Sequence, residues 1–147
     1  MKYGSAPMIT PATQAILLVE DSSADAYLIQ RAVKDCGRNI QLCTMADGAD
    51  ALQFLRKEHP LTHVPTPALI ILDLRLPTMS GTELLAEIRQ LPAYQQTPIV
   101  ILSRLDKARE EAACLQLGAS AYVQKSSNFY DFFNSVKALV GNWLGKN

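Results

Sequence analysis

Short apolar segments alternate with longer amphipathic stretches five times between Ala15 and the end of the chain. Parallel strands joined by helical crossovers produce this pattern, because each crossover packs back onto one face of the sheet. The predicted strands cover residues 15–19, 41–45, 68–72, 99–102 and 121–123. Three of these segments are almost entirely apolar, as buried strands of a parallel sheet are. The alternation therefore predicts an α/β fold built on a parallel sheet.

The segments between the strands predict five helices. The first begins at Ser22 or Ser23 and ends before Gly37, and the second begins after Asp47. The other three are expected over residues 82–90, 106–117 and 128–144. No internal repeat and no linker to a second domain is visible, so we expect a leader over residues 1–14 and one domain over residues 15–147. A proline-containing loop at 59–67 carries His59 and His63, which we interpret as solvated side chains, since no acidic or cysteine partner lies at metal-ligand spacing.

The composition excludes several classes of protein. The 147 residues include 14 basic and 14 acidic side chains, so nothing favours binding to nucleic acid. The longest clean apolar runs have five residues, far fewer than the roughly 20 that cross a bilayer, and we expect no membrane partner. Cys36, Cys43 and Cys114 are odd in number and widely spaced, which argues against disulfides and zinc and favours a reducing cytoplasm.

Polar side chains follow four of the five predicted strands. Glu20 and Asp21 follow the first, Asp73 the third, Ser103 the fourth and Lys125 the fifth. The carboxyl ends of parallel strands meet at one edge of the sheet, which is where ligands bind in open α/β folds. Three carboxylates gathered there would repel one another unless a cation lay among them, and Mg²⁺ prefers such oxygen ligands.

This arrangement predicts phosphoryl chemistry. The Lys125 ammonium can balance the negative charge of a phosphoryl group, and the Ser103 hydroxyl can reach one of its oxygens. Asp73 ends the central apolar run at residues 69–72 and is the better candidate for a nucleophile, which would form an acyl phosphate. Glu20 and Asp21 are adjacent and better placed to hold a metal.

These residues resemble the receiver domain of two-component response regulators. The motifs that carry the resemblance are Val19-Glu20-Asp21-Ser22, Leu72-Asp73-Leu74-Arg75-Leu76-Pro77 with Gly81, Leu102-Ser103, Leu117-Gly118-Ala119 and Tyr122 to Lys125. The resemblance covers residues 15 to about 144. It implies a flavodoxin-like, doubly wound, five-stranded sheet of order 2-1-3-4-5, in a single domain that accepts a phosphoryl group from a sensor histidine kinase.

The resemblance also assigns the phosphorylation site. Asp73 would be the phosphoacceptor. Mg²⁺ would be held by Asp21, Asp73 and the backbone carbonyl of Arg75, with Glu20 assisting through a water molecule. Such a protein is not an enzyme in the usual sense, although it would catalyse its own phosphorylation and dephosphorylation.

A conformational switch is implied by the same resemblance. Lys125 would contact the phosphoryl group and Ser103 would close on it. In the family this movement lets the aromatic side chain at the position of Tyr122 turn inward, which reshapes the face made by the fourth helix, fifth strand and fifth helix.

Two positions depart from the family pattern. Ser126 follows Lys125 where the family usually has proline after a cis bond, so we expect either a trans bond or a locally strained one. Arg104 follows Ser103 where a small residue is usual, and our hypothesis is that it controls access to the phosphoryl group. The ending from Lys125 to Phe129 resembles that of single-domain regulators that partner bacterial phytochromes, which makes a phytochrome-type kinase the expected partner.

The C-terminal end of the chain is rich in aromatic residues. The spacing of most of them predicts a helix face packed on the sheet. Adjacent aromatic residues cannot all point inward, so some rings are expected at an exposed edge. We predict a symmetric homodimer whose interface includes Tyr130, Phe133 and Tyr122.

Two other classes of protein do not match these residues. Phosphatases of the haloacid dehalogenase type need a second aspartate where Arg75 stands, and dinucleotide-binding turns need glycines where Glu20 to Ser23 stand. An adaptor that keeps the receiver fold but signals without phosphorylation is the remaining alternative. It would be expected to lose Asp73 or Lys125, and both are present.

Overall fold

The computed structural model describes residues 13–57 and 64–145. His59, His63 and nearly all of the predicted leader lie outside the described residues. Thr13 is the first described residue, and the first strand begins at Gln14.

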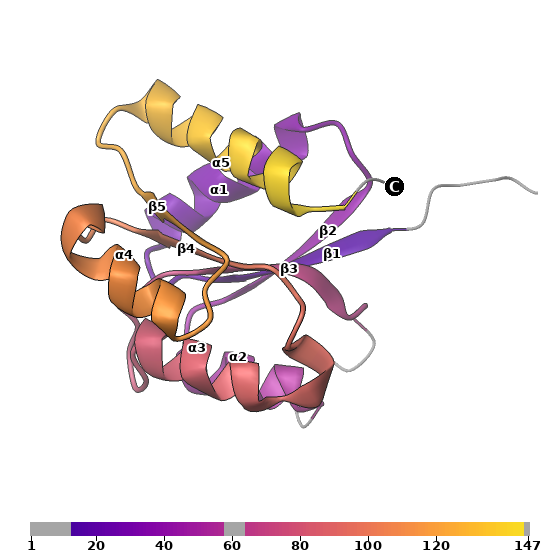
Figure 1. Ribbon diagram of the computed structural model, residues 1–147. Helices are drawn as coiled ribbons and strands as arrows, with labels where there is room; N and C mark the ends of the chain where they lie inside the picture. Colours follow the sequence, from indigo (N-terminus) through magenta and orange to yellow (C-terminus); the bar gives the residue numbers. More distant parts are fainter. Residues whose placement is uncertain (1–12, 58–63, 146–147) are drawn as a thin grey trace, which may run out of the picture.

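Five parallel strands form one sheet in the order β2-β1-β3-β4-β5 (Figure 1). The strands are β1 (Gln14–Val19), β2 (Ile40–Met45), β3 (Pro67–Leu72), β4 (Ile99–Ser103) and β5 (Ala121–Gln124). The predicted fold, its parallel sheet and its strand order are confirmed. Each strand is one residue longer than the apolar pattern indicated, because Gln14, Ile40, Pro67, Ser103 and Gln124 extend the strands with polar or boundary residues.

Helices cover both faces of the sheet. They are α1 (Ser23–Asp35), α2 (Gly48–Leu55), α3 (Gly81–Gln90), α4 (Lys107–Gln116) and α5 (Phe129–Trp143), with a 3₁₀ turn, η1 (Pro92–Tyr94), after α3. Helices α1 and α5 lie side by side on one face, and α2, α3 and α4 lie on the other (Figure 1). The side chain of the residue before each α-helix accepts a hydrogen bond from its first turn; these caps are Ser22, Asp47, Ser80, Asp106 and Asn128. Such caps satisfy backbone donors that a helix leaves free, and they set where each helix begins.

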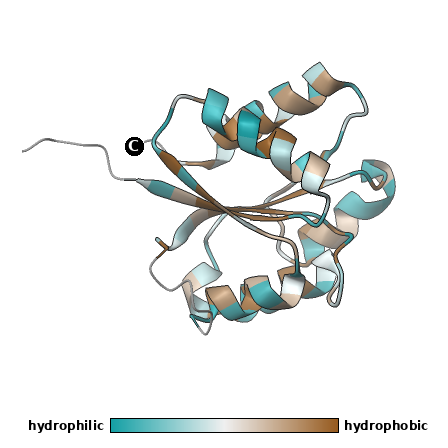
Figure 2. Cartoon of the chain, turned by 180° about the vertical axis from the view of Figure 1, so that it is seen from behind, coloured by the Kyte–Doolittle hydropathy of each residue, from teal (hydrophilic) through white to brown (hydrophobic). Residues whose placement is uncertain are grey.

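The sheet divides the hydrophobic core into two clusters. Ile16 and Leu18 of β1 pack with α1 and α5, whereas Leu17 and Val19 pack with α2 and α3. This alternation follows from the period of two in a strand, and all four side chains are fully buried because helices cover both faces. Figure 2 shows the strands as a hydrophobic band between helices of mixed colour.

Helix α4 has the smallest buried surface of the five α-helices. Within this helix, all of which is described, Cys114 is the only buried side chain. The neighbouring Leu115 is 44% exposed. The other helices each have at least four buried residues.

Arg89 ties together the segments at the amino ends of β4 and β5. Its guanidinium donates to the backbone carbonyls of Gly118, Tyr94 and Thr97, at 2.8, 2.6 and 2.7 Å. Gly118 has a φ of +107°, a conformation that favours glycine and closes the turn after α4. The edge of the sheet opposite the strand carboxyl ends is thereby fixed.

The three cysteines are free thiols, as the sequence predicted. None of the helices in the described part of the chain has the length and apolar character that a membrane span needs.

Candidate phosphorylation site

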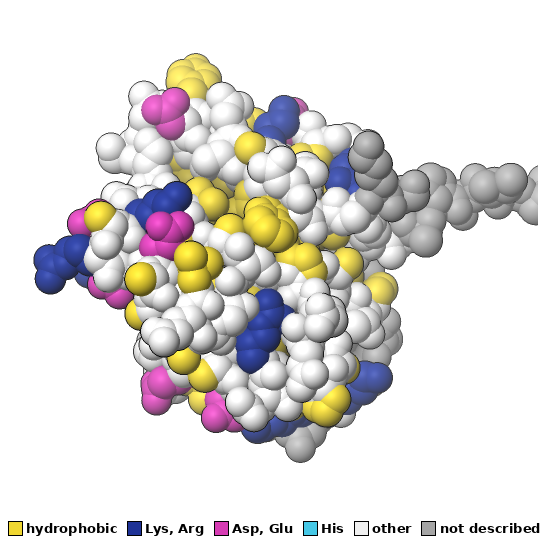
Figure 3. All heavy atoms as spheres, viewed as in Figure 1, with side chains coloured by type: hydrophobic (Ala, Val, Ile, Leu, Met, Phe, Trp, Pro, Cys, Tyr) yellow, Lys and Arg dark blue, Asp and Glu magenta, His cyan; other side chains and the backbone are white. Residues whose placement is uncertain are grey.

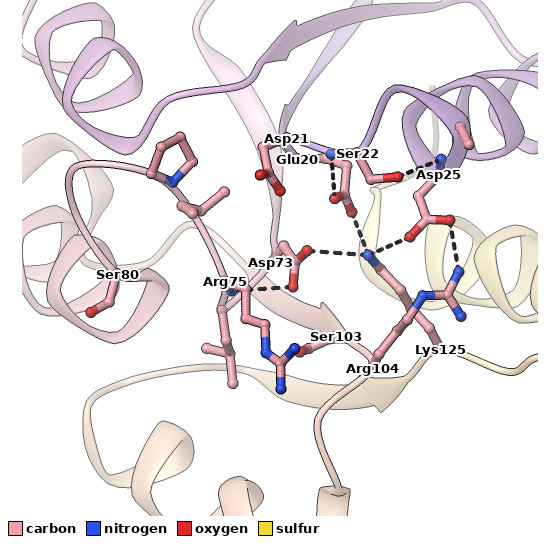
Figure 4. Close-up of a pocket in the computed structure, with 14 residues that line it drawn as sticks. Glu20, Asp21, Ser22, Asp25, Asp73, Arg75, Ser80, Ser103, Arg104 and Lys125 are labelled. Atoms are coloured by element: carbon pink, nitrogen blue, oxygen red, sulfur yellow. Dashed lines mark hydrogen bonds and ion pairs between the residues drawn. The ribbon is translucent and has the colours of Figure 1, made fainter.

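The predicted site residues meet in one pocket at the carboxyl ends of the strands (Figure 4). The pocket has a volume of about 900 Å³. Its lining includes Glu20, Asp21, Asp73, Arg75, Ser103, Arg104 and Lys125. The topology therefore brings together side chains from β1, β3, β4 and β5 that lie up to 105 positions apart in the chain.

Backbone hydrogen bonds fix these residues just beyond the ends of the strands. The amide of Glu20 donates to the carbonyl of Met45 at 2.9 Å, and the amide of Asp73 donates to the carbonyl of Val19 at 3.0 Å. On the other side, the amide of Lys125 donates to the carbonyl of Ser103 at 2.7 Å. The backbones of Glu20, Asp73 and Lys125 are thus fixed by hydrogen bonds to neighbouring strands.

Three carboxylates form a cluster suited to a cation. Glu20, Asp21 and Asp73 each offer an oxygen, and these oxygens all lie within 4.8 Å of one another. Glu20 and Asp73 are buried and Asp21 is exposed, so the cluster opens to solvent on one side. Carboxylate oxygens with room for water are the ligands that hard divalent cations take. The residues present therefore fit a divalent metal ion.

The ammonium of Lys125 lies among the buried acids (Figure 4). Its Nζ is 2.6 Å from Oε1 of Glu20, 2.9 Å from Oδ2 of Asp25 and 3.2 Å from Oδ2 of Asp73. Burial alone lowers the pKa of Lys125, but the hydrogen bonds to Glu20 and Asp25 and the charges of Glu20 and Asp73 outweigh it and raise the pKa above its usual value. Lys125 is therefore positively charged at neutral pH.

The surroundings of Glu20 raise the pKa of its carboxyl group. Burial raises its pKa to about 7, the hydrogen bond from Lys125 partly opposes this rise, and the neighbouring charge of Asp73 adds to it. Its second oxygen, Oε2, accepts a hydrogen bond of 3.1 Å from the amide of Ser22. A substantial fraction of Glu20 is therefore protonated at neutral pH when no metal is bound.

Ser103 and Tyr122 are joined through the β4–α4 loop. Oγ of Ser103 accepts a hydrogen bond from the amide of Leu105 at 3.2 Å, and the hydroxyl of Tyr122 donates to the carbonyl of the same residue at 2.8 Å. Tyr122 is 2% exposed and points inward. It is too buried to contribute to an interface with a second protomer. The other two predicted interface residues, Tyr130 and Phe133, line a groove between α1 and α5 together with Tyr27.

Arg104 contacts an acid that the sequence analysis did not single out. Its NH2 donates to Oδ1 of Asp25 at 2.7 Å, and its guanidinium lies 6.0 Å from the centre of the Phe132 ring. Among the described residues, Asp25 is the acid with which Arg104 forms an ion pair. The postulated effect of Arg104 on phosphoryl access remains a prediction.

Asp25 is the main site residue that sequence reasoning missed. It lies in the first turn of α1, three residues after the cap Ser22, where acids are common because they interact favourably with the helix dipole. This common role at a helix start gives no sign that Asp25 also contacts Lys125. Nothing in the local sequence indicates that its carboxylate reaches Lys125, 100 positions later.

Gly81 allows α3 to pack directly on the backbone of Asp73 and Leu74. A Cβ at this position would lie 2.3 Å from the carbonyl oxygen of Asp73 and 2.5 Å from Cα of Leu74. Only a hydrogen atom fits there. The glycine of the motif is therefore required by the close approach of two backbones.

The bond between Lys125 and Ser126 is trans, since the described residues contain no cis peptide bond. This is one of the two outcomes that we expected where serine replaces proline.

The sequence of the chain matches a known protein family. The family model described as "Response regulator receiver domain" matches residues 16–137. The chain belongs to this receiver-domain family. The receiver domain is 37% identical over 131 residues to the response regulator Rcp1 of Synechocystis sp., covering 89% of each chain. It is also 33% identical to the probable methanogenesis regulatory protein FilR2 of Methanothrix harundinacea, covering 90% of this chain and 84% of that protein.

Solved structures agree with this assignment. The phosphorylated cyanobacterial phytochrome response regulator RcpA superposes with a TM-score of 0.85 at 36% identity, covering 91% of the receiver domain and 96% of RcpA. The Mn²⁺-bound form of Rcp1 gives a TM-score of 0.83 at 36% identity with the same coverage. Among these relatives, Rcp1 has thus been solved with a divalent metal ion, and this chain has an acidic cluster that fits one.

Proposed function

We propose that this receiver domain accepts a phosphoryl group on Asp73 from the phosphohistidine of a sensor histidine kinase. The observation that carries the proposal is the pairing of Asp73 with Lys125 in a pocket that also holds two further acids and the Ser103 hydroxyl. Asp73 is 7% exposed, so its carboxylate is shielded by protein but still reaches the pocket.

The transfer exchanges one bond to phosphorus for another. An oxygen of the Asp73 carboxylate attacks the phosphorus, the bond from phosphorus to the histidine nitrogen breaks, and the electron pair stays on the imidazole. The product is an acyl phosphate. Lys125 lies next to the Asp73 carboxylate and balances the negative charge of the phosphoryl group. Ser103 supplies a hydroxyl that donates to a phosphoryl oxygen. Hydrolysis by water later returns the carboxylate and inorganic phosphate.

We assign Mg²⁺ as the metal. Asp21 and Asp73 would bind it directly with the backbone carbonyl of Arg75, and Glu20 would bind it through water. The ion supplies charge neutralisation to the phosphoryl oxygens. Support comes from the oxygen-only donor set and from the Mn²⁺-bound relative Rcp1.

Incubation with acetyl phosphate and Mg²⁺, followed by intact-mass measurement, tests the proposal. The native protein should gain the mass of one phosphoryl group, and Asp73→Asn should gain none. Asp131→Asn is the matched control, because Asp131 is exposed on α5 and far from the motif in sequence. No mass gain in the native protein would favour the phosphorylation-independent adaptor, and equal gain in Asp73→Asn would refute Asp73 as the acceptor.

We further propose a phytochrome-type histidine kinase as the partner. RcpA is described as a phytochrome response regulator, and it resembles this chain over 91% of its length. Phosphotransfer from a purified phytochrome kinase should be at least tenfold faster than from an unrelated histidine kinase at equal concentrations. Equal rates would contradict this partner.

We propose a homodimer that uses the face formed by α4, β5 and α5 together with the exposed aromatic side chains at the start of α5. Figure 3 shows hydrophobic side chains gathered on this side of the molecule between α5 and α4. At the start of α5, Tyr130 is 73% exposed, and the Phe133 ring stacks on that of Phe129 at 5.9 Å. Tyr130 and Phe133 both lie at the edge of α5 that faces α1, in a groove that Tyr27 also lines. Aromatic side chains at such edges are favoured in interfaces. Sedimentation should give a dimer for the native protein and a monomer for Tyr130→Glu; a native monomer at high concentration would exclude it.

A further inference from the structure

Asp25 bridges the two basic residues of the pocket. Its Oδ2 accepts a hydrogen bond from Lys125 at 2.9 Å, and its Oδ1 accepts one from Arg104 at 2.7 Å (Figure 4). The residue is 6% exposed. Burial raises the pKa of Asp25, but the hydrogen bonds and charges of Lys125 and Arg104 outweigh it and leave the pKa below its usual value. The bridging carboxylate is therefore ionised.

The backbone of Asp25 is held in place by the start of α1. Its amide donates to Oγ of Ser22 at 3.2 Å, and the amide of Ser22 donates to Glu20. Further along α1, Ile29 and Ala32 are fully buried in the core. Asp25 thus acts from a rigid helix, whereas Lys125 and Arg104 follow strand ends and have long side chains.

Asp25 is one of three carboxylates that accept hydrogen bonds from the ammonium of Lys125. An ammonium has three N–H donors, and Glu20, Asp25 and Asp73 accept all three. In the proposed reaction, Asp73 forms the bond to phosphorus and Glu20 serves the metal. Asp25 is the partner with neither task, so it can hold Lys125 throughout the transfer.

Arg104 is held on the far side of Asp25. Its side chain is 53% exposed and is anchored by the carboxylate of Asp25 and by the face of Phe132. Both anchors belong to the layer of α1 and α5. This placement keeps a mobile cation at the edge of the pocket and leaves the space next to Asp73 open to a phosphoryl donor.

We propose that Asp25 is a positioning residue for phosphoryl transfer, which fixes the ammonium of Lys125 beside Asp73 and holds Arg104 at the edge of the pocket. The inference rests on the proposed function. It adds a fourth acid, outside the metal cluster, whose task is to orient the two cations.

The kinetic test uses Asp25→Asn, which keeps the shape of the side chain but loses its charge. With acetyl phosphate and Mg²⁺, the rate constant of phosphorylation at saturating donor should fall about tenfold, while the Mg²⁺ concentration for half-maximal rate changes less than twofold. Asp131→Asn, also three residues after a helix cap, should leave both unchanged. Asp25→Ser is the second variant in case Asp25→Asn does not fold.

Nuclear magnetic resonance separates this inference from the proposed function. The ammonium signal of Lys125, assigned by its loss in Lys125→Met, should shift or broaden in Asp25→Asn without any phosphoryl donor. Arg104→Met should leave that signal in place and slow the reaction less than Asp25→Asn does.

Three outcomes would overturn the inference: an unchanged rate, an unchanged ammonium signal, or a rate loss that added Mg²⁺ restores. If the native protein takes no phosphoryl group, the proposed function fails, and the ammonium signal still reports whether Asp25 holds Lys125.

Discussion

The hydroxyl of Tyr122 donates a hydrogen bond of 2.8 Å to the backbone carbonyl of Leu105. The amide of Leu105 in turn donates to Oγ of Ser103. One residue of the β4–α4 loop therefore contacts both side chains that the sequence assigned to a switch. A movement of the Ser103 hydroxyl toward a phosphoryl group would break one of these bonds and disturb the other.

Tyr122→Phe should lower the free energy of unfolding by about 1 kcal/mol, because the carbonyl of Leu105 loses its buried donor. Urea denaturation measures this change. Tyr130→Phe is the matched control and should change stability by less than about 0.5 kcal/mol, since Tyr130 is 73% exposed. Equal losses in the two variants would show that the Tyr122 hydroxyl contributes nothing specific.

Gly81→Ala should destabilise the protein by about 3 kcal/mol, because the new methyl group would collide with the backbone of Asp73 and Leu74. It should also slow phosphorylation, since the acceptor strand must shift. Thermal unfolding and the acetyl phosphate assay measure the two effects.

Gly141→Ala is the control for helix propensity. Nothing lies within 4 Å of a Cβ at this exposed position in α5, so alanine should stabilise the protein by about 0.5–1 kcal/mol. If Gly81→Ala were as stable as Gly141→Ala, the contact between α3 and the acceptor strand would not be limiting.

The metal-free protein should lose stability as the pH rises from about 5 to 8. The pKa of Glu20 is raised to about 7, so the folded protein binds this proton more tightly than the unfolded chain does. The resulting stabilisation is present below the unfolded pKa and is lost as the pH rises through 7, by about 2 kcal/mol.

Urea midpoints measured in EDTA at several pH values test this dependence. Glu20→Gln cannot titrate, so its stability should fall less over the same range. A native protein whose stability rises between pH 5 and 8, with Glu20→Gln behaving identically, would contradict the raised pKa.

Arg89→Met should cost about 3 kcal/mol of stability, because it leaves the carbonyls of Gly118, Tyr94 and Thr97 without their donor. The phosphorylation rate well below the melting temperature should be unchanged, since Arg89 binds at the opposite edge of the sheet. Arg89→Lys should lose less stability than Arg89→Met. A large rate loss in folded Arg89→Met would reveal coupling between the two edges.

Sequence patterns located the strands and the strand-end residues because a change from apolar to polar residues marks both. Asp73 directly follows a strand in which all residues but one are buried, and this position alone places it at the rim of the sheet. The tertiary contacts of Asp25 and Arg89 could not be predicted in this way. An acid in the first turn and a base in the last turn of a helix are ordinary, and only the tertiary fold brings them to Lys125 or to three carbonyls.

Helix α4 is held to the rest of the domain by few buried contacts, because Cys114 is its single buried side chain. Local opening of a segment costs roughly what its buried contacts contribute, so the amide protons of α4 should exchange with solvent faster than those of α1 or α5. An element that opens at low cost needs only a small bias to change its average position. A coupling free energy of about 1–3 kcal/mol from a distant phosphoryl group would then be enough to redistribute the conformations of this helix.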